Sequence, residues 1–399
     1  MIDYRLPGSR MKGALQPGGI REIVNKAEAL QRQGRNIIHL EIGRPDYDSP
    51  PCAKKAAARA LENGQVHYTD MTGTPELRNA IAAAVNRDYG MSVDPDREVV
   101  VTAGAMEALA TIFLTLLEPG DEVIVPTPFF PAYGLQVSMA GGVLREVPCR
   151  FENGFRLNPE DLEAAVTPRT RLILINTPNN PSGAAMDRKQ LQEIADLAIK
   201  YDLLVVSDEC YEKFLYDGTH LSIASLPKMK ERTLIVSAAS KTFSMTGWRI
   251  GWIIAPAEIK PYAAKCHQHL GTCANSFAQA GVAEALHCAS DDVRAMIAGY
   301  RERRDRMIER LRKIEGFETH MPQGAFYAFP RVSGLTSRLG MDVTELAGWL
   351  LEEAGVAVVP GDTFHASDPS LRLAYCRPPE EIEEAMDRIE AAVNTRIRR

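Results

Sequence analysis

The sequence lacks the features of a membrane protein or a nucleic-acid binder. Its longest mainly apolar run, Ala108 to Leu117, is too short for the ~20 residues that a membrane span needs. Charge and proline interrupt residues 1–13, so we expect no signal peptide there. The 46 Lys and Arg against 52 Asp and Glu leave a net charge of −6, whereas nucleic-acid binders usually carry a basic excess. We therefore expect no membrane and no nucleic acid among its partners.

Cysteine pairs with metal-type spacing are also missing. The seven cysteines are scattered and form no C-x-x-C motif, so we interpret them as reduced thiols of a cytoplasmic protein. His267 and His269 resemble a metal pair, but no carboxylate or cysteine stands nearby at ligand spacing. A solvated helix face is the favoured interpretation for both, and we predict no metal site.

Seven short apolar segments recur between residues 98 and 255, and amphipathic segments lie between most of them. Such strands, apolar along their whole length, are typical of a parallel sheet that is buried on both faces. The pattern therefore predicts an α/β fold with a mostly parallel seven-stranded sheet covered by helices on both faces. The predicted strands are 98–102, 121–126, 144–148, 171–176, 203–207, 234–237 and 250–255.

The pattern changes after about residue 285. Residues 291–313 predict one long helix, whose arginine-rich run we interpret as a solvated face with acidic partners three and four residues away. The rest of the chain alternates short strands and helices. A length of 399 residues favours two or three domains. We expect two: a large domain over 46–284, and a smaller α+β domain built from 1–45 and 285–399.

In parallel α/β sheets, ligands bind at the carboxyl ends of the strands. After the first predicted strand come Gly104, Ala105 and Met106 at a helix start, a natural although common anion site. Phe130 follows the second strand and is either core or a surface for a planar ligand. Asn180 lies in the loop PNNPSG, which is either a rigid amide-bearing loop or a plain turn.

Charged residues follow the later strands. Asp208 ends a buried strand, where a carboxylate is costly unless it meets a cation, and Tyr211 stands three residues on. Ser240 and Lys241 follow the next strand, with Arg249 eight residues after the lysine. One ligand, pyridoxal 5′-phosphate, would use this whole set. Its phosphate needs helix N–H groups and arginine, its ring an aromatic face and a carboxylate, and its aldehyde a lysine.

The ordered motifs make the chain closely similar to the fold-type I pyridoxal-phosphate enzymes, specifically the class I/II aminotransferases of the aspartate-aminotransferase type. The resemblance spans nearly the whole sequence. The motifs that carry it are GRPDYDSP (43–50), HYTDMTGTPELR (67–78), PNNPSG (178–183), SDECYE (207–212), SKTFSMTGWRIGW (240–252), VAVVPG (356–361) and LRLAY (371–375).

The resemblance implies a role for each residue at the strand ends. Lys241 would form the Schiff base with the cofactor and carry protons. Asp208 would pair with the ring nitrogen, Tyr211 and Asn180 would bind the ring oxygen, and Phe130 would stack on the ring. The phosphate would be held by Arg249 and the N–H groups of residues 104–106.

The resemblance also implies substrate and partner contacts. Arg372 would grip the substrate α-carboxylate, with Gly43 and Asn180 beside it. A bidentate arginine suits that task better than a lysine. Tyr68 would reach the phosphate in a neighbouring subunit, which implies a homodimer with shared sites.

Four positions depart from the family pattern. Ala238 stands where many relatives carry Ser or Gly, so Ser237 or Ser240 would supply the phosphate hydroxyl instead. Phe130 replaces the usual Trp or Tyr. Ile20 and Met106 occupy positions that bind a distal carboxylate in some aspartate enzymes, which puts strict aspartate specificity in doubt. Arg21 would offset that loss, but as an exposed residue of a first helical turn we interpret it as structural.

These observations favour ping-pong transamination between an amino acid and a 2-oxo acid. The alternative is a pyridoxal-phosphate lyase acting on a sulfur amino acid, because the same fold and lysine serve both reactions. A non-catalytic binding module is disfavoured because every cofactor position is filled. A nicotinamide dehydrogenase is disfavoured because no G-x-G-x-x-G follows a strand.

Overall fold

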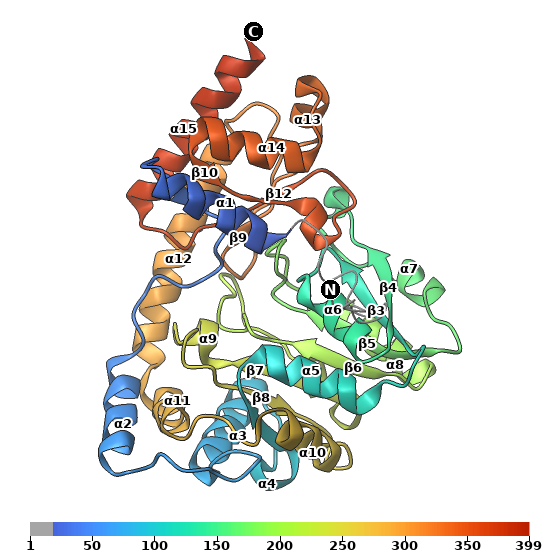
Figure 1. Cartoon of the computed structure of the whole chain (residues 1–399). Helices are drawn as coiled ribbons and strands as arrows, with labels where there is room; N and C mark the ends of the chain where they lie inside the picture. Colours follow the sequence, from blue (N-terminus) through green and yellow to red (C-terminus); the bar gives the residue numbers. More distant parts are fainter. Residues whose placement is uncertain (1–18, 399) are drawn as a thin grey trace, which may run out of the picture.

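The computed structural model describes residues 19–398 (Figure 1). Its large sheet has the strand order β2-β8-β7-β6-β5-β3-β4, and β8 alone runs antiparallel to its neighbours. The prediction of a mostly parallel seven-stranded sheet is therefore confirmed. Its strands are β2 (Val99–Thr102), β3 (Glu122–Thr127), β4 (Val143–Pro148), β5 (Thr170–Asn176), β6 (Leu204–Asp208), β7 (Thr233–Ala238) and β8 (Gly251–Ile254).

Alternate residues of the central strands face two different cores. On β5, Leu172 and Leu174 pack in a cluster with side chains of α5, whereas Ile173 and Ile175 pack in a cluster with side chains of α8. The sheet is therefore buried by helices on both faces, as the uninterrupted apolar strands predict. Helices in this part of the chain are α2 (Pro51–Glu62), α3 (Pro75–Tyr89), α4 (Pro95–Glu98), α5 (Ala105–Leu116), α6 (Ala132–Met139), α7 (Pro159–Ala164), α8 (Arg188–Lys200), α9 (Ala239–Thr242), α10 (Lys260–Gly271) and α11 (Ser276–Cys288).

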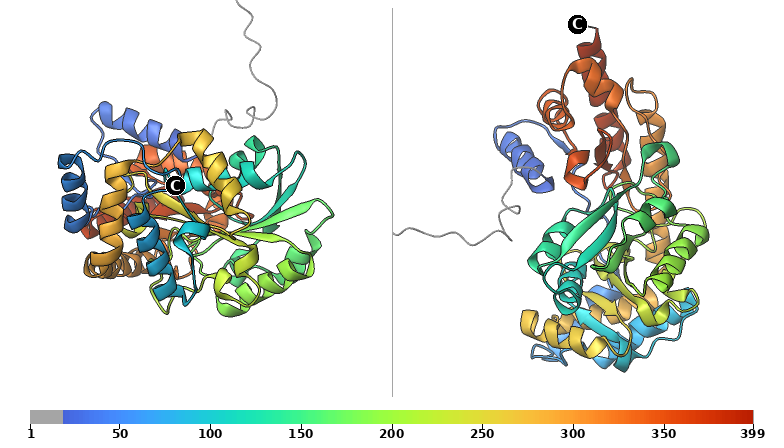
Figure 2. Two further views of the ribbon diagram at one scale, coloured as in Figure 1. Left: turned by 90° about the horizontal axis from the view of Figure 1, so that it is seen from below. Right: turned by 90° about the vertical axis from the view of Figure 1, so that its right-hand side faces the viewer.

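The chain ends assemble beside the sheet. The first described strand, β1 (Ile38–His39), pairs in parallel with β10 (Val356–Ala357), and Figure 2 shows α1 (Ile20–Arg32) on the flank of the C-terminal elements. The remaining elements are α12 (Ser290–Leu311), β9 (Tyr327–Ala328), α13 (Ser333–Leu339), α14 (Val343–Trp349), β11 (Val359–Pro360), β12 (Leu371–Ala374) and α15 (Pro379–Ile397).

The long helix α12 runs from the helices around α11 up to the C-terminal elements (Figure 1). Its arginine run is only partly the solvated face that we expected. Arg303 and Arg304 are buried, and Arg303 forms an ion pair of 2.7 Å with Asp46. Arg310 binds three acidic residues of α15, whereas Arg306 keeps the predicted pairing with Glu302 four residues earlier.

Two further expectations are wrong. Cys52 of α2 and Cys288 of α11 form a disulfide, so not all cysteines are reduced; the sequence could not show that these two helices pack together. His267 lies buried against α5, with its Nδ1 2.5 Å from the Glu107 carboxylate, rather than on a solvated face.

Within residues 19–398, no three histidine, cysteine or acidic side chains lie close enough to hold a metal ion. No helix in that range has the length and apolar character needed to cross a membrane.

Candidate active site

A cavity of about 600 Å³ opens where the chain ends meet the carboxyl ends of the strands. Asn176 closes β5, Asp208 closes β6 and Ala238 closes β7, and all three line the cavity. Eleven of the residues predicted from sequence line it too. They are Gly43, Ala105, Met106, Phe130, Asn180, Asp208, Tyr211, Ser240, Lys241, Arg249 and Arg372.

Lys241 lies in the short helix α9, directly after β7. Its Nζ points into the cavity and donates a hydrogen bond of 2.7 Å to the Gly43 carbonyl. Burial lowers the pKa of Lys241 to about 8, and the positive charges of Arg372 and Arg249 act in the same direction. About a tenth of this amine is therefore neutral, and thus nucleophilic, at pH 7, far more than for an ordinary lysine.

Asp208 is a buried carboxylate that lacks a cation. Its Oδ2 accepts a hydrogen bond of 2.6 Å from the Tyr133 hydroxyl, and its Oδ1 accepts one of 3.1 Å from the Cys210 N–H. Burial raises its pKa, while the Tyr133 bond favours the ionised form. No cationic side chain of residues 19–398 forms an ion pair with it, so it is suited to a positively charged group on a ligand.

Arg372, on β12, is the buried cation of the opposite wall. Only 2% of its surface is exposed, and it donates hydrogen bonds to the Glu41 carbonyl (2.5 Å) and to Asn180 Oδ1 (3.2 Å). Burial lowers its pKa. No carboxylate within residues 19–398 pairs with it, and its Nε has no hydrogen-bond partner. A buried planar guanidinium with free donors is a natural site for a ligand carboxylate.

A chain of asparagine amides connects the strand end that carries Asp208 with the guanidinium of Arg372. The Asn176 side chain donates to the Asp208 carbonyl (3.0 Å) and accepts from the Asn180 N–H (2.8 Å). Asn180 then accepts from Arg372. The end of β6 is thereby held at a fixed position relative to β12.

Tyr211 meets a second tyrosine from the C-terminal part of the chain. The hydroxyl oxygens of Tyr211 and Tyr327 lie 2.9 Å apart, and the guanidinium of Arg372 sits 4.7 Å from the Tyr327 ring centre. Gly43 is necessary here, since a Cβ at that position would overlap the Tyr327 hydroxyl. Both tyrosines therefore face the space between Lys241 and Arg372.

The start of α5 forms an anion cradle. Gly104 caps the helix with φ +86° and no side-chain hydrogen bond, so the first N–H groups keep no side-chain cap. Arg249 donates to the Ala103 and Thr246 carbonyls at 3.1 Å, and a Cβ on Gly104 would collide with its guanidinium. Ser240 lines this cavity, whereas Ser237 lines a different one. Helix N–H groups beside an arginine suit a phosphate.

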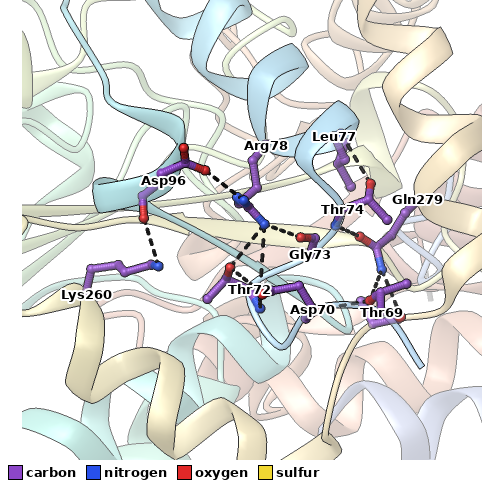
Figure 3. Close-up of polar contacts among 11 residues, drawn as sticks. Thr69, Asp70, Thr72, Gly73, Thr74, Leu77, Arg78, Asp96, Lys260 and Gln279 are labelled. Atoms are coloured by element: carbon purple, nitrogen blue, oxygen red, sulfur yellow. Dashed lines mark hydrogen bonds and ion pairs between the residues drawn. The ribbon is translucent and has the colours of Figure 1, made fainter.

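Two predicted site residues do not line the cavity: Gly104, which lies against Arg249 at its edge, and Tyr68, which lies away from it. Tyr68 is 85% exposed and lines a separate hollow beside α2 and α11. The segment that follows it is held by a polar network: Gln279 binds Thr69 (3.2 Å) and the Thr74 N–H (2.7 Å), and buried Arg78 binds Asp96 (2.7 Å; Figure 3). Tyr68 is thus presented outward from a firmly anchored loop.

Sequence reasoning missed several residues of the cavity. Asn176 ends the predicted strand 171–176, and Tyr133 follows the predicted strand 121–126. A polar side chain close to a strand end was therefore the signal that could have found both residues. Tyr327 gave no signal, because it follows no strand of the large sheet. The remaining missed lining residues are Val24, Glu28, Ile42, Arg44, Leu109, Cys210, Ala238 and Thr246.

The fold and the cavity define an α/β enzyme whose site combines a reactive lysine with groups for two anions and a cation. Residues 35–389 match the family model described as Aminotransferase class I and II, and the chain belongs to this family. The comparisons support an aminotransferase, an enzyme that transfers an amino group between an amino acid and a 2-oxo acid, over the alternative lyase.

Similar proteins support the same assignment. An aspartate aminotransferase of Pyrococcus abyssi is 42% identical, over 94% of this chain and 95% of the relative. An aromatic-amino-acid aminotransferase of Thermococcus litoralis is 40% identical over the same shares. The solved aspartate aminotransferase of Thermus thermophilus with maleate is 39% identical, with a TM-score of 0.91 over 97% of this chain and 99% of that one.

Proposed function

We propose that the protein catalyses ping-pong transamination with pyridoxal 5′-phosphate, the cofactor that its family implies. The residues fit that group: among residues 19–398, Asp208 is a buried acid that pairs with no cation and the start of α5 has no side-chain cap, and Lys241 has a depressed pKa. The single observation that supports the proposal most strongly is the convergence of Lys241, Asp208 and Arg372 on one cavity.

When bound, the cofactor supplies an aldehyde that accepts the amine and a conjugated ring that withdraws electrons from the substrate α-carbon. Asp208 would hold the ring nitrogen in its protonated form, helped by the Tyr133 bond. Tyr211 and Asn180 would bind the ring oxygen, and Phe130 would cover the ring. Arg249, Ser240 and residues 104–106 would bind the phosphate.

Substrate handling would fall to the opposite wall. Arg372 would bind the α-carboxylate in a bidentate manner, with Asn180 and Gly43 beside it. This would place the α-carbon near Lys241, whose neutral Nζ would accept the α-proton and later release it.

Lys241→Ala tests this proposal. We expect it to abolish steady-state formation of a new amino acid from an amino donor and a 2-oxo acid, because no other group in the cavity can replace the amine. Lys189→Ala, which changes a lysine that is 80% exposed on α8, is the matched control and should keep full activity. Substantial steady-state transamination by Lys241→Ala would refute the assignment.

We further propose a homodimer in which Tyr68 completes the neighbouring site. Its exposure, together with that of Val66 two residues earlier (55%), supports a surface that a second copy covers. Co-expression of Lys241→Ala with Tyr68→Ala tests this, because a mixed dimer contains one site that has both intact residues. Activity above that of either variant alone is expected; activity equal to the sum of the two separate variants would contradict a shared site.

The domain division is also a proposal: 46–284 for the large domain, and 1–45 with 285–399 for the small one. The pairing of β1 with β10 supports it within the described residues, and residues 1–18 lie outside them.

We propose a cytoplasmic location because amino acids and 2-oxo acids are metabolites of the cell interior. The Cys52–Cys288 disulfide argues against it, since disulfides are rare in most cytosolic proteins. Cell fractionation would decide the location.

A further inference from the structure

Several lining residues of the cavity have no role in the proposed contacts with the cofactor and the α-carboxylate. With the α-carboxylate on Arg372 and the α-carbon near Lys241, the part of the lining left for the substrate side chain includes α1 and the first turns of α5. The character of that wall therefore decides which amino acids fit.

This wall is apolar. Ile20 packs against the cluster of Phe329, Val359 and Phe364, and the Phe364 ring centre lies 4.8 Å from the Arg372 guanidinium. Met106 belongs to the first turn of α5, which is anchored by a hydrogen bond of 2.8 Å from Gln136 to the Met106 carbonyl. The apolar lining residues of this wall are Ile20, Val24, Ile42, Met106 and Leu109.

Among residues 19–398, the wall offers no buried cation for a second carboxylate. Lys241, Arg249 and Arg372 already have proposed roles. The other two basic residues of the lining, Arg21 and Arg44, are both exposed at the rim. Glu28, whose side chain is 53% exposed, adds a negative charge to the same rim. An ion pair at such a solvated position contributes little, whereas a carboxylate placed against aliphatic side chains loses hydration.

The size of the cavity is compatible with large side chains. Its volume of about 600 Å³ lies within the range of sites that enclose whole small molecules. Met106 also forms an adaptable boundary, because the unbranched thioether chain can repack around ligands of different shape. An aromatic or a branched aliphatic side chain would therefore find both space and contact there.

We infer that the preferred amino donors carry an apolar side chain, aromatic or long aliphatic, and that Met106 and Ile20 are specificity-determining residues. This inference rests on the proposed transamination. It separates this chain from relatives named for aspartate, and it depends on wall chemistry rather than on overall similarity.

A donor panel with the wild-type holoenzyme is the first test. Loss of the visible absorbance of the bound cofactor would be followed in single turnovers with phenylalanine, leucine, methionine and aspartate. We expect the rate at low substrate concentration to be about tenfold or more higher for the apolar donors than for aspartate. A rate for aspartate equal to or above that for phenylalanine would overturn the inference. Conversion by no donor at all would instead refute the proposed function.

Met106→Lys is the second test. A cation on the wall should raise kcat/KM for aspartate by about tenfold and lower it for phenylalanine. Met139→Lys is the matched control, because Met139 has a similar exposure (46% against 42%) but lies outside the cavity. It should leave the donor ratio unchanged.

Two outcomes of these variants would overturn the role of the wall. In one, Met106→Lys changes all donors by the same factor, as a general structural effect would. In the other, the wild-type enzyme favours aspartate and Arg21→Ala or Arg44→Ala removes that preference, which would assign specificity to the rim.

Discussion

Arg372 donates a hydrogen bond of 2.5 Å to the backbone carbonyl of Glu41, and the side chain of Glu41 is itself fully buried nearby. One carboxylate oxygen of Glu41 lies 2.7 Å from His39 Nδ1, and the other has no hydrogen-bond partner in the described structure. Burial lowers the pKa of Arg372, and the negative charge of Glu41 opposes this effect together with Tyr327 and Tyr211. Glu41 therefore offsets part of the cost of a buried guanidinium.

Replacement of Glu41 by Gln would remove this negative charge near Arg372. A substrate carboxylate would then be the main anion near Arg372, so we expect KM for the amino donor to fall about threefold to tenfold. The melting temperature of the ligand-free protein should fall as well, because the cation is less compensated. His39→Gln removes the hydrogen-bonding partner but keeps the carboxylate, and should leave KM close to wild type. A raised KM in Glu41→Gln would contradict the charge effect.

The reactivity of Lys241 should depend on pH in an unusual range. Its pKa of about 8 lies well below the ~10.4 of an ordinary lysine, and only the neutral amine is a nucleophile. Labelling of Lys241 in the cofactor-free protein should therefore increase with pH with a midpoint near 8, as measured by mass spectrometry of the modified peptide. A midpoint at the ordinary lysine value would show that burial does not depress this pKa.

Tyr133→Phe should weaken cofactor binding. Burial raises the pKa of Asp208, and the hydrogen bond from Tyr133 lowers it by favouring the ionised carboxylate. Without that bond, the pKa of Asp208 should rise further. A hydrogen bond to a charged group contributes ~2 kcal/mol, which corresponds to a loss of affinity of about thirtyfold. Fluorescence titration with pyridoxal 5′-phosphate measures it. Tyr201→Phe, at an exposed position at the end of α8, is the control, and equal affinities for both variants would disprove the role of Tyr133.

Cys52→Ser should lower stability without affecting catalysis. The disulfide joins α2 to α11 across a separation of 236 residues, and closing so long a loop typically stabilises a protein by ~2–5 kcal/mol. Neither cysteine lines the active-site cavity. We expect a lower melting temperature under oxidising conditions and an unchanged kcat. If wild type and variant melt at the same temperature without reductant, the bond does not contribute to stability.

The prediction of the large sheet succeeded because each central strand is buried on both faces. Val205 and Val206, for example, face different cores. The strand is therefore apolar along its length and easy to recognise in the sequence. The strand ends then located Asp208, Lys241 and Asn180 correctly in one cavity, since parallel strands bring their carboxyl ends to the same edge. The helices α2, α3 and α11 were not predicted.

Contacts between distant segments were beyond prediction. The burial of His267 depends on Glu107 in another helix, and the Cys52–Cys288 pair depends on the packing of two helices that are far apart in sequence. Tyr327 enters the site from a two-residue strand with no distinguishing pattern. Single-sequence patterns report local periodicity, whereas these pairings arise from the packing of elements.

The sequence by itself determined the fold class, the family resemblance and the chemical groups of the site, because strand hydrophobicity and short motifs are local properties. The tertiary structure alone decided how those groups are paired. It placed Tyr133 on Asp208, Tyr327 on Tyr211 and the Glu41 carbonyl on Arg372, and it arranged Ile20 and Met106 on one apolar wall. These relationships follow from burial and close packing between segments up to 331 residues apart, which no local pattern encodes.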